Sequence, residues 1–265
     1  MVEEDTILLR HEEGARYVVL NRPEVLNAFN EPMLVALLDA VRAAAAEESV
    51  RCLVLTGAGR AFSSGQDLAV VRDRYAGGGT MRFDRLIRQH YNPVITAIRT
   101  MEKPVIASVN GIAAGAGCSL ALACDLRIAA ESAAFMQAFV NVGLVPDAGS
   151  SFMLPRLIGI ARAMELAFTG RRVSAGQALA LGMVNDVVAD DMLGEKTGEW
   201  AQKLARMPTR AIGLAKKALN AAWNSELPEQ LDREAECQGL AEQTRDHREG
   251  VAAFVEKRLP RFEGR

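Results

Sequence analysis

The hydrophobic and polar positions of the chain form two alternating patterns. Short apolar runs bounded by Gly, Asn, Asp or Pro have the length and composition of buried strands, and they cover residues 7–9, 17–20, 52–56, 105–109, 126–129, 134–136 and 187–188. Apolar residues spaced three and four apart predict helices over residues 31–48, 83–100, 150–157 and 160–169, with another beginning at Ser174. Asn30 is expected to cap the first helix, and Ser174 with Gln177 has the spacing of a capping box. Strands that alternate with helices in this way predict an α/β core.

The stretch VIASVNGIAAGAGCSLALACD, residues 105–125, combines a strand, a glycine-rich turn and an apolar helix over residues 118–124. At such a helix start the first N–H groups lack intrahelical partners, and small residues let a ligand approach them. The turn is therefore a candidate half-site for a developing oxyanion. Alternatively, its glycines serve only close packing between helix and sheet. The stretch lacks a GxGxxG motif and a Walker lysine, so nucleotide phosphate binding is not indicated.

Two other regions differ from this core pattern. The glycines at 77–79 lie among charged residues, which predicts a mobile surface loop over residues 72–81. From about residue 191 the chain is rich in Ala, Glu, Lys and Arg, with breaks at Pro208 and Pro228. The sequence thus predicts a core that holds the site over residues 1–190 and a helical region over residues 191–265.

Composition narrows the classes of function. The 265 residues carry a net charge of −2, which argues against a nucleic-acid partner, and no apolar run is long enough to cross a bilayer. The N-terminus lacks a signal-peptide core, and the four cysteines show no CxxC spacing, so a cytoplasmic protein with reduced cysteines is expected. The three histidines are scattered, so no metal site is expected.

Five segments together carry a family resemblance. They are LNRPEVLNAF (20–29), GRAFSSGQDL (59–68), KPVIASVNGIAAGAGCSLALACDLRIA (103–129), GLVPDAGSSFMLPRLIG (143–159) and VEKRLPRF (255–262). In this order they resemble the crotonase superfamily, the enoyl-CoA hydratases and isomerases. The resemblance implies a spiral of ββα units and a C-terminal helical region that builds homotrimers, often paired into dimers of trimers. It also implies an acyl-CoA thioester substrate and no separate cofactor, since CoA is part of the substrate.

The same resemblance implies roles for particular residues. Two backbone N–H groups, those of Gln66 and Ala116, would hold the thioester oxygen as negative charge develops on it. The residues expected around the substrate and its CoA moiety are Arg22, Val25, Ala28, Ser64, Gly65, Asp67, Leu68, Ala114, Gly115, Phe139, Phe254 and Lys257. Phe254 and Lys257 match a pair that often reaches CoA from a neighbouring subunit, although Lys257 also fits a solvated helix face. Asp67 and Asp125 are also expected to form caps or salt bridges.

The acid–base residues distinguish the reactions of this superfamily. Hydratases resemble one another in two glutamates, at the positions held here by Ser119 and Phe139, so the sequence argues against hydration. Asp147 is the remaining candidate base. Its place one turn before a helix by itself favours an N-cap, and it is the family context that favours the base. Its segment most resembles a branch of isomerases that includes ring-epoxide isomerases of phenylacetyl-CoA breakdown and can act as 3,2-enoyl-CoA isomerases. The branch usually has two glycines where this chain has Ser150 and Ser151.

Several alternatives stay open at this point. The chain could be a hydratase-like member, or a dehalogenase-like member in which Asp147 attacks an aryl thioester. Dehalogenases of that kind pair the aspartate with a Trp where this chain has Phe139. A non-catalytic acyl-CoA binder or an RNA-associated scaffold is a different class, and the near-neutral charge argues against RNA. His90 and Tyr91 are expected near the acyl pocket, with no role assigned.

Overall fold

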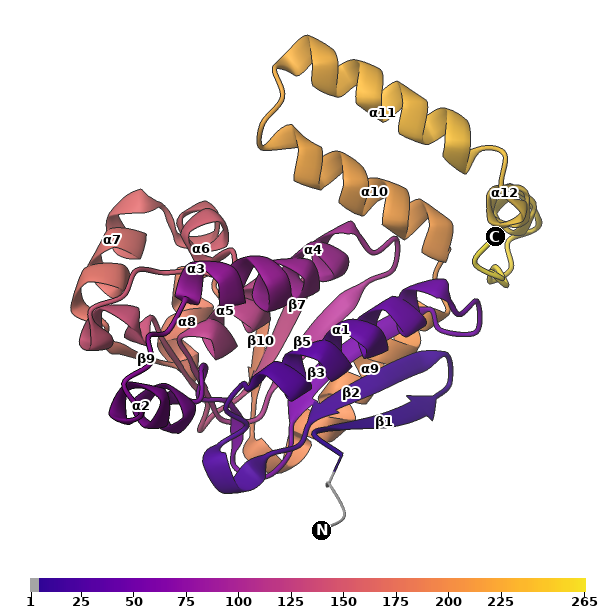
Figure 1. The fold of residues 1–265 in the computed structure, drawn as a ribbon. Helices are drawn as coiled ribbons and strands as arrows, with labels where there is room; N and C mark the ends of the chain where they lie inside the picture. The colour runs from indigo at the N-terminus through magenta and orange to yellow at the C-terminus, as the bar shows by residue number, and fades with distance from the viewer. Residues whose placement is uncertain (1–4) are drawn as a thin grey trace.

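Two β-sheets surrounded by helices form the body of the protein in this computed structural model, which describes residues 5–265 (Figure 1). The larger sheet has the order β1-β2-β3-β5-β7-β10. Its strands are β1 (Ile7–Glu12), β2 (Ala15–Leu20), β3 (Cys52–Gly57), β5 (Val105–Val109), β7 (Leu126–Ala130) and β10 (Asp186–Val188). The β1–β2 hairpin is antiparallel, as its sequence predicts, and the other neighbours in this sheet are parallel.

The smaller sheet has the order β4-β6-β8-β9 and consists of three-residue strands. They are β4 (Ala61–Ser63), β6 (Ile112–Ala114), β8 (Ala134–Met136) and β9 (Arg172–Ser174), of which the first three are parallel. Strands β3, β5 and β7 of the large sheet are each followed by one of these parallel short strands. The chain therefore winds through both sheets before each crossover, as in the expected ββα spiral.

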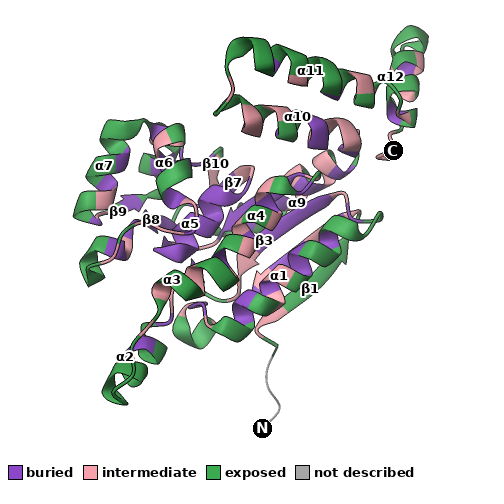
Figure 2. Cartoon of the chain, turned by 45° about the horizontal axis from the view of Figure 1, so that its top comes forward, coloured by how far each residue is buried: buried purple, intermediate pink, exposed green. Residues whose placement is uncertain are grey.

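Helices pack around these sheets and bury between one face and their whole surface. Helix α1 (Glu31–Ala46) buries one face, which includes Met33, Leu37 and Val41, and Asn30 caps it by accepting from the Met33 N–H (Figure 2). Helix α5 (Ala116–Ala123) is buried at all eight positions. Helices α6 (Ser150–Ile158), α7 (Ile160–Thr169) and α8 (Ala175–Leu181) also belong to the body. Short 3₁₀ turns at Pro23–Val25, Ala138–Val142 and Asp190–Met192 precede α1, α6 and the helix that begins at Leu193. The capping box of Ser174 and Gln177 at the start of α8 is confirmed.

The segment between β4 and β5 corrects two predictions. Helix α2 (Leu68–Ala76) covers half of the predicted loop over residues 72–81, because the helix continues until Gly77 ends it. The predicted single helix over residues 83–100 contains a widened turn. It consists of α3 (Phe83–Leu86), a π-helical turn (Ile87–Tyr91) and α4 (Asn92–Thr100).

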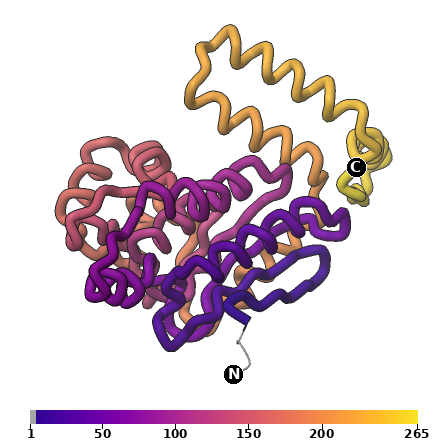
Figure 3. Tube along the Cα trace, viewed as in Figure 1, coloured from indigo at the N-terminus to yellow at the C-terminus, as the bar shows by residue number. Residues whose placement is uncertain are grey.

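The helices after residue 190 divide into two groups. Helix α9 (Leu193–Ala205) packs against the large sheet, and Leu193, Ala201 and Ala205 belong to the same core as the strands. Core packing thus continues past residue 190 to the end of α9. Helices α10 (Thr209–Ala222), α11 (Leu227–Ala241) and α12 (Arg245–Glu256) extend away from the body (Figure 3). None of the helices in residues 5–265 is long and apolar enough to cross a membrane.

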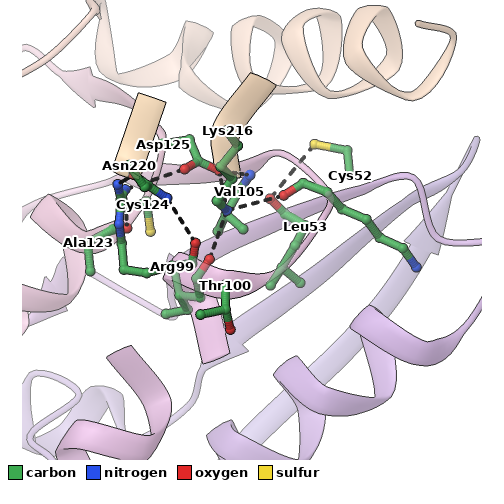
Figure 4. A network of polar contacts seen from close by, with 12 residues as sticks. Cys52, Leu53, Arg99, Thr100, Val105, Ala123, Cys124, Asp125, Lys216 and Asn220 are labelled. Atoms are coloured by element: carbon green, nitrogen blue, oxygen red, sulfur yellow. Dashed lines mark hydrogen bonds and ion pairs between the residues drawn. The ribbon is translucent and has the colours of Figure 1, made fainter. Parts of the chain in front are cut away.

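A buried lysine attaches these outer helices to the body. Lys216 on α10 donates from Nζ to Asp125 Oδ2 at 2.7 Å and to the Ile98 carbonyl at 2.8 Å (Figure 4). Asp125 Oδ2 also accepts from the Val105 N–H at 2.9 Å, so one carboxylate joins β5 to α10. The expected salt bridge of Asp125 is confirmed. The four cysteines are free and buried, as the sequence predicts.

Candidate active site

The C-terminal ends of β4, β6 and β8 lie side by side, because these strands are parallel neighbours. The segment after each strand contributes to one cavity of about 160 Å³, which α3 and the π-helical turn close from the outside. Its lining residues are Ser64, Gln66, Leu68, Phe83, Ile87, Tyr91, Gly115, Ala116, Ala138, Phe139, Asn141, Val142, Leu144 and Asp147. The cavity thus brings together both predicted oxyanion donors and the predicted base.

Asp147 lies in the turn between the 3₁₀ segment after β8 and helix α6. The N-cap position of α6 is Gly149, and the Asp147 side chain makes no capping bond; only its carbonyl oxygen accepts, from the Ser150 N–H at 2.9 Å. The N-cap interpretation of Asp147 is therefore wrong. The helix begins at Ser150 even though serines replace the usual glycines.

The Asp147 carboxyl group is poorly solvated. Its Oδ1 atom is buried and has no hydrogen-bond partner among residues 5–265. Burial raises the pKa of Asp147 from its ordinary value to about 6, because desolvation penalises the charged form. A carboxyl group with such a pKa can exchange protons near neutral pH, which is what a general base requires.

Gln66 and Ala116, whose backbone N–H groups are the predicted oxyanion donors, both line this cavity. Phe29 lies beside Gln66 in an isolated parallel bridge, but it bonds to the residues on either side of Gln66. The Phe29 N–H donates to the Gly65 carbonyl, and the Phe29 carbonyl accepts from the Asp67 N–H. In this parallel pattern the Gln66 N–H points to the opposite side, and within residues 5–265 no backbone acceptor takes it. The Ala116 N–H is the first of helix α5 and has no intrahelical acceptor.

Two glycines let these donors lie close together. Gly65 has φ +89°, and a Cβ there would lie 2.7 Å from the Ala114 carbonyl oxygen and 3.2 Å from the Ala116 nitrogen. A Cβ on Gly117 would lie 2.3 Å from the Ser63 carbonyl oxygen. The packing interpretation of the glycine-rich turn is therefore confirmed, and the oxyanion half-site stays a prediction that this close packing of α5 on β4 makes possible.

The positions of the hydratase glutamates hold no acid. The buried Ser119 hydroxyl donates to the Gly115 carbonyl at 3.2 Å and is satisfied there. Phe139 forms an apolar part of the cavity wall. Among the described lining residues, Asp147 is the one carboxylate. Residues 5–265 contain no group of His, Cys, Asp and Glu side chains that could hold a metal ion.

The residues expected near the CoA nucleotide stabilise the loop that carries Gln66. Arg22 donates from Nη1 to the Ala28 carbonyl at 2.7 Å and to Asp67 Oδ2 at 3.0 Å. Asp67 also caps α2 by accepting from the Ala69 N–H, so its predicted cap and salt bridge are both confirmed. The Ser64 hydroxyl donates to the Val25 carbonyl at 3.3 Å. These contacts fix the loop, and their predicted contact with CoA stays a prediction.

Phe254 and Lys257 do not join the cavity within this chain. They lie on and directly after α12, away from α2 and α3 (Figure 1). Phe254 is 86% exposed, and Lys257 has φ +55° at the C-cap of the helix. Their contact with CoA, expected from a neighbouring subunit, stays a prediction.

Sequence reasoning assigned no role to Tyr91, which proves to be a wall of the cavity. Its hydroxyl donates to Gln66 Oε1 at 2.8 Å, and its ring packs edge to face on Phe29. Burial and the nearby charge of Asp147 both raise the pKa of Tyr91. The preceding residue, His90, points away from the base, with Nε2 3.3 Å from Glu31 Oε1. Tyr91 and Gln66 are 25 residues apart, so no local pattern indicates their contact.

The profile of the family described as Enoyl-CoA hydratase/isomerase matches residues 10–265. The chain belongs to this family. It is 44% identical to the 1,2-epoxyphenylacetyl-CoA isomerase of Escherichia coli (strain K12) over 98% of both chains. It is 46% identical to a probable enoyl-CoA hydratase of Rhodobacter capsulatus, again over 98% of both. A crystal structure of an enoyl-CoA hydratase subunit from Geobacillus kaustophilus superimposes with a TM-score of 0.90 at 38% identity, covering 98% of each chain. Family membership is consistent with an acyl-CoA substrate and confirms the expected fold class.

Proposed function

We propose that this protein is an acyl-CoA isomerase that holds an enolate in the cavity and moves a proton with Asp147. The carboxylate takes a proton from C2 of a 3-enoyl-CoA, and the electron pair of the broken C–H bond passes into the thioester carbonyl. The Gln66 and Ala116 N–H groups stabilise the resulting oxyanion. Asp147 returns the proton to C4, which leaves a C2–C3 double bond and regenerates the carboxylate.

The observation that carries this proposal is the single carboxylate of the cavity. A 1,3 proton shift needs one group that accepts and returns the same proton, whereas hydration needs a base for water and an acid for the α-carbon. Asp147 has the burial and the raised pKa that suit a proton shuttle. The hydroxyl groups of Ser64 and Tyr91 in the cavity wall, and that of Ser119 in α5, are engaged in hydrogen bonds.

The size of the cavity supports a ring-shaped acyl group. Its volume of about 160 Å³ is close to that of the apolar cavities of about 150 Å³ that bind benzene in proteins. A ring 1,2-epoxide interconverts with its seven-membered oxepin form, in which a ring double bond occupies acyl C3–C4. The same proton shift then moves that double bond to C2–C3. The Escherichia coli relative is a 1,2-epoxyphenylacetyl-CoA isomerase, which favours this substrate.

Substrate comparison tests the proposal. The purified protein is offered ring-1,2-epoxyphenylacetyl-CoA, a 3-enoyl-CoA and a 2-enoyl-CoA, and products are followed by chromatography. We expect conversion of the first two and very slow addition of water to the third. Hydration at about 10 per second, a rate typical of enzymes, would instead identify a hydratase, as the probable enoyl-CoA hydratase of Rhodobacter capsulatus is named.

A further inference from the structure

The Gln66 side chain separates two hollows. On one side it lines the acyl cavity, together with Tyr91 and Asp147. On the other it lines a second hollow of about 530 Å³, bounded by the start of α1, by α2 and by the α3 segment. The half-buried side chain of Gln66 thus forms part of the wall of the acyl cavity and part of the wall of the second hollow.

A hydrogen bond holds this amide in place. Tyr91 donates its hydroxyl to Gln66 Oε1 at 2.8 Å, and this is the one hydrogen bond of the Gln66 side chain within residues 5–265. The Tyr91 ring is 5% exposed and rests against Phe29 with ring centroids 5.9 Å apart and an interplanar angle of 84°. Packing therefore restrains the tyrosine donor, and the position of the Gln66 amide depends on it.

The second hollow has a mixed lining with an apolar part. Val70, Met81 and Leu86 supply the apolar surface. The other side chains around it, besides Gln66, are polar or charged, namely Asn30, Glu31, Arg74, Thr80, Arg82, Arg85, Gln89 and His90. A linear acyl chain could lie on the aliphatic side chains, with its end towards solvent. A linear chain of twelve carbons is longer than a cavity matched to one ring, so it would need this space.

We propose that the Tyr91–Gln66 hydrogen bond determines acyl-chain specificity by closing the acyl cavity towards the second hollow. With the bond formed, the cavity accepts short or ring-shaped acyl groups. When the bond is absent, the Gln66 amide turns away, the two hollows join, and a long linear chain enters the second. The inference rests on the proposed function only in assuming that the cavity holds the acyl group.

Binding of saturated acyl-CoA esters tests this without any chemical step. Dissociation constants of butyryl-, octanoyl- and dodecanoyl-CoA are measured by calorimetry for the protein and for Tyr91→Phe, which keeps the ring. We expect Tyr91→Phe to raise the preference for dodecanoyl over butyryl by on the order of fivefold, the equilibrium factor of one hydrogen bond. Gln66→Ala keeps the backbone N–H but removes the wall, so its shift should be at least as large. In the double variant, Tyr91→Phe should change the chain-length preference no further than Gln66→Ala does alone.

Tyr17→Phe on β2 is the matched control, because it removes another buried tyrosine hydroxyl far from the cavity and should leave the length preference unchanged. An unchanged preference in both Tyr91→Phe and Gln66→Ala would overturn the inference while leaving the proposed function intact. If Tyr91→Phe does not fold, Gln66→Ala alone decides. Failure of the unaltered protein to bind any of the esters would overturn both proposals.

Discussion

At Asp147 one structural property has two effects. The burial that leaves Oδ1 without a partner also raises the pKa of the carboxyl group to about 6. A stronger base removes the C2 proton more readily, and a pKa near the working pH keeps much of the group ionised. The side chain is therefore suited to proton transfer by its surroundings rather than by a polar neighbour.

Replacing Asp147 by Asn should abolish most of the activity and preserve the fold. The amide is similar in size but cannot accept a proton from carbon, so isomerase turnover should fall by roughly 10²–10⁴-fold. Circular dichroism and calorimetry with a non-reacting acyl-CoA should give a native spectrum and near-normal affinity. Normal turnover in a folded Asp147→Asn protein would show that another group is the base.

The pH dependence of turnover should follow the same carboxyl group. The ionised form is the active base, so kcat/KM should rise with pH, with a midpoint near 6, and level off above it. At pH 5 the rate should be about a tenth of the plateau, as expected one unit below the pKa. A profile that is flat from pH 5 to 7 would contradict this assignment.

At the residue scale, the sequence predicts a site residue only where that residue lies within a recognisable local motif. Asp147, Gln66 and Ala116 each lie in a contiguous motif that resembles a family pattern, so they could be named in advance. Tyr91 could not be given a role, because its contact with Gln66 forms only when the π-helical turn faces the loop after β4. Whether Asp147 caps α6 also required the structure, since the same spacing fits either interpretation.

At the scale of elements, the site depends on the contact between helix α5 and strand β4. Each carries one proposed oxyanion donor at or just beyond its end, and Gly117 lies directly against the Ser63 carbonyl. Neither the Gln66 N–H nor the Ala116 N–H makes a backbone hydrogen bond within residues 5–265. Their separation is therefore set by how closely the helix packs on the strand.

Gly117→Ala should disrupt this contact. Its Cβ would lie 2.3 Å from a backbone oxygen, so helix and strand must separate, at a cost of about 1–3 kcal/mol of stability. Turnover should fall even at temperatures where the variant is folded, because the donors move apart. Thermal melts and kinetics at a low temperature measure the two effects.

Gly194→Ala provides the comparison. Gly194 is exposed near the start of α9, and a Cβ there has nothing within 4 Å. Activity should be unchanged, and stability should stay the same or rise by up to about 1 kcal/mol. If both variants behaved alike, close packing at Gly117 would not be what positions the donors.

The elements that sequence reasoning missed are the shortest ones. Strands β4, β6 and β9 have three residues each, too few to display a period, and β4 lies within a stretch that its glycines mark as a loop. The π-helical turn leaves the apolar spacing of its helix almost unchanged, so it has no signature in the pattern. The long, strongly periodic segments, such as α1 and α7, were placed within one or two residues of their observed ends.

At the scale of the whole molecule, helices α10 to α12 stand apart from the body with apolar surface uncovered. Large exposed side chains on and between these helices are Leu219, Leu227, Leu231, Val251, Phe254 and Val255. Because exposed apolar side chains that gather in one region of a protein are typical of interaction sites, we expect these helices to contact a neighbouring copy. Phe254 would be expected to reach a neighbour's ligand only if copies assemble through this region.

We therefore predict a homotrimer or a dimer of trimers. Light scattering at micromolar concentration should give three or six times the chain mass of 28.6 kDa. Dilution separates the two forms if the trimer is the tighter unit. A mass of 28.6 kDa under these conditions would refute the prediction.

The unpartnered carboxyl oxygen of Asp147 also has a consequence for the folding equilibrium. In the folded state this group binds a proton at a higher pH than in the unfolded chain, so stability falls as the pH rises from about 4 to about 6 and stays lower above that. Asn at this position avoids the cost of burying the charge. Chemical denaturation should show Asp147→Asn more stable than the unaltered protein by on the order of 1–3 kcal/mol at pH 7, and equally stable near pH 4. The ionised Asp147 carboxylate would then be needed for activity and would at the same time lower the stability of the fold.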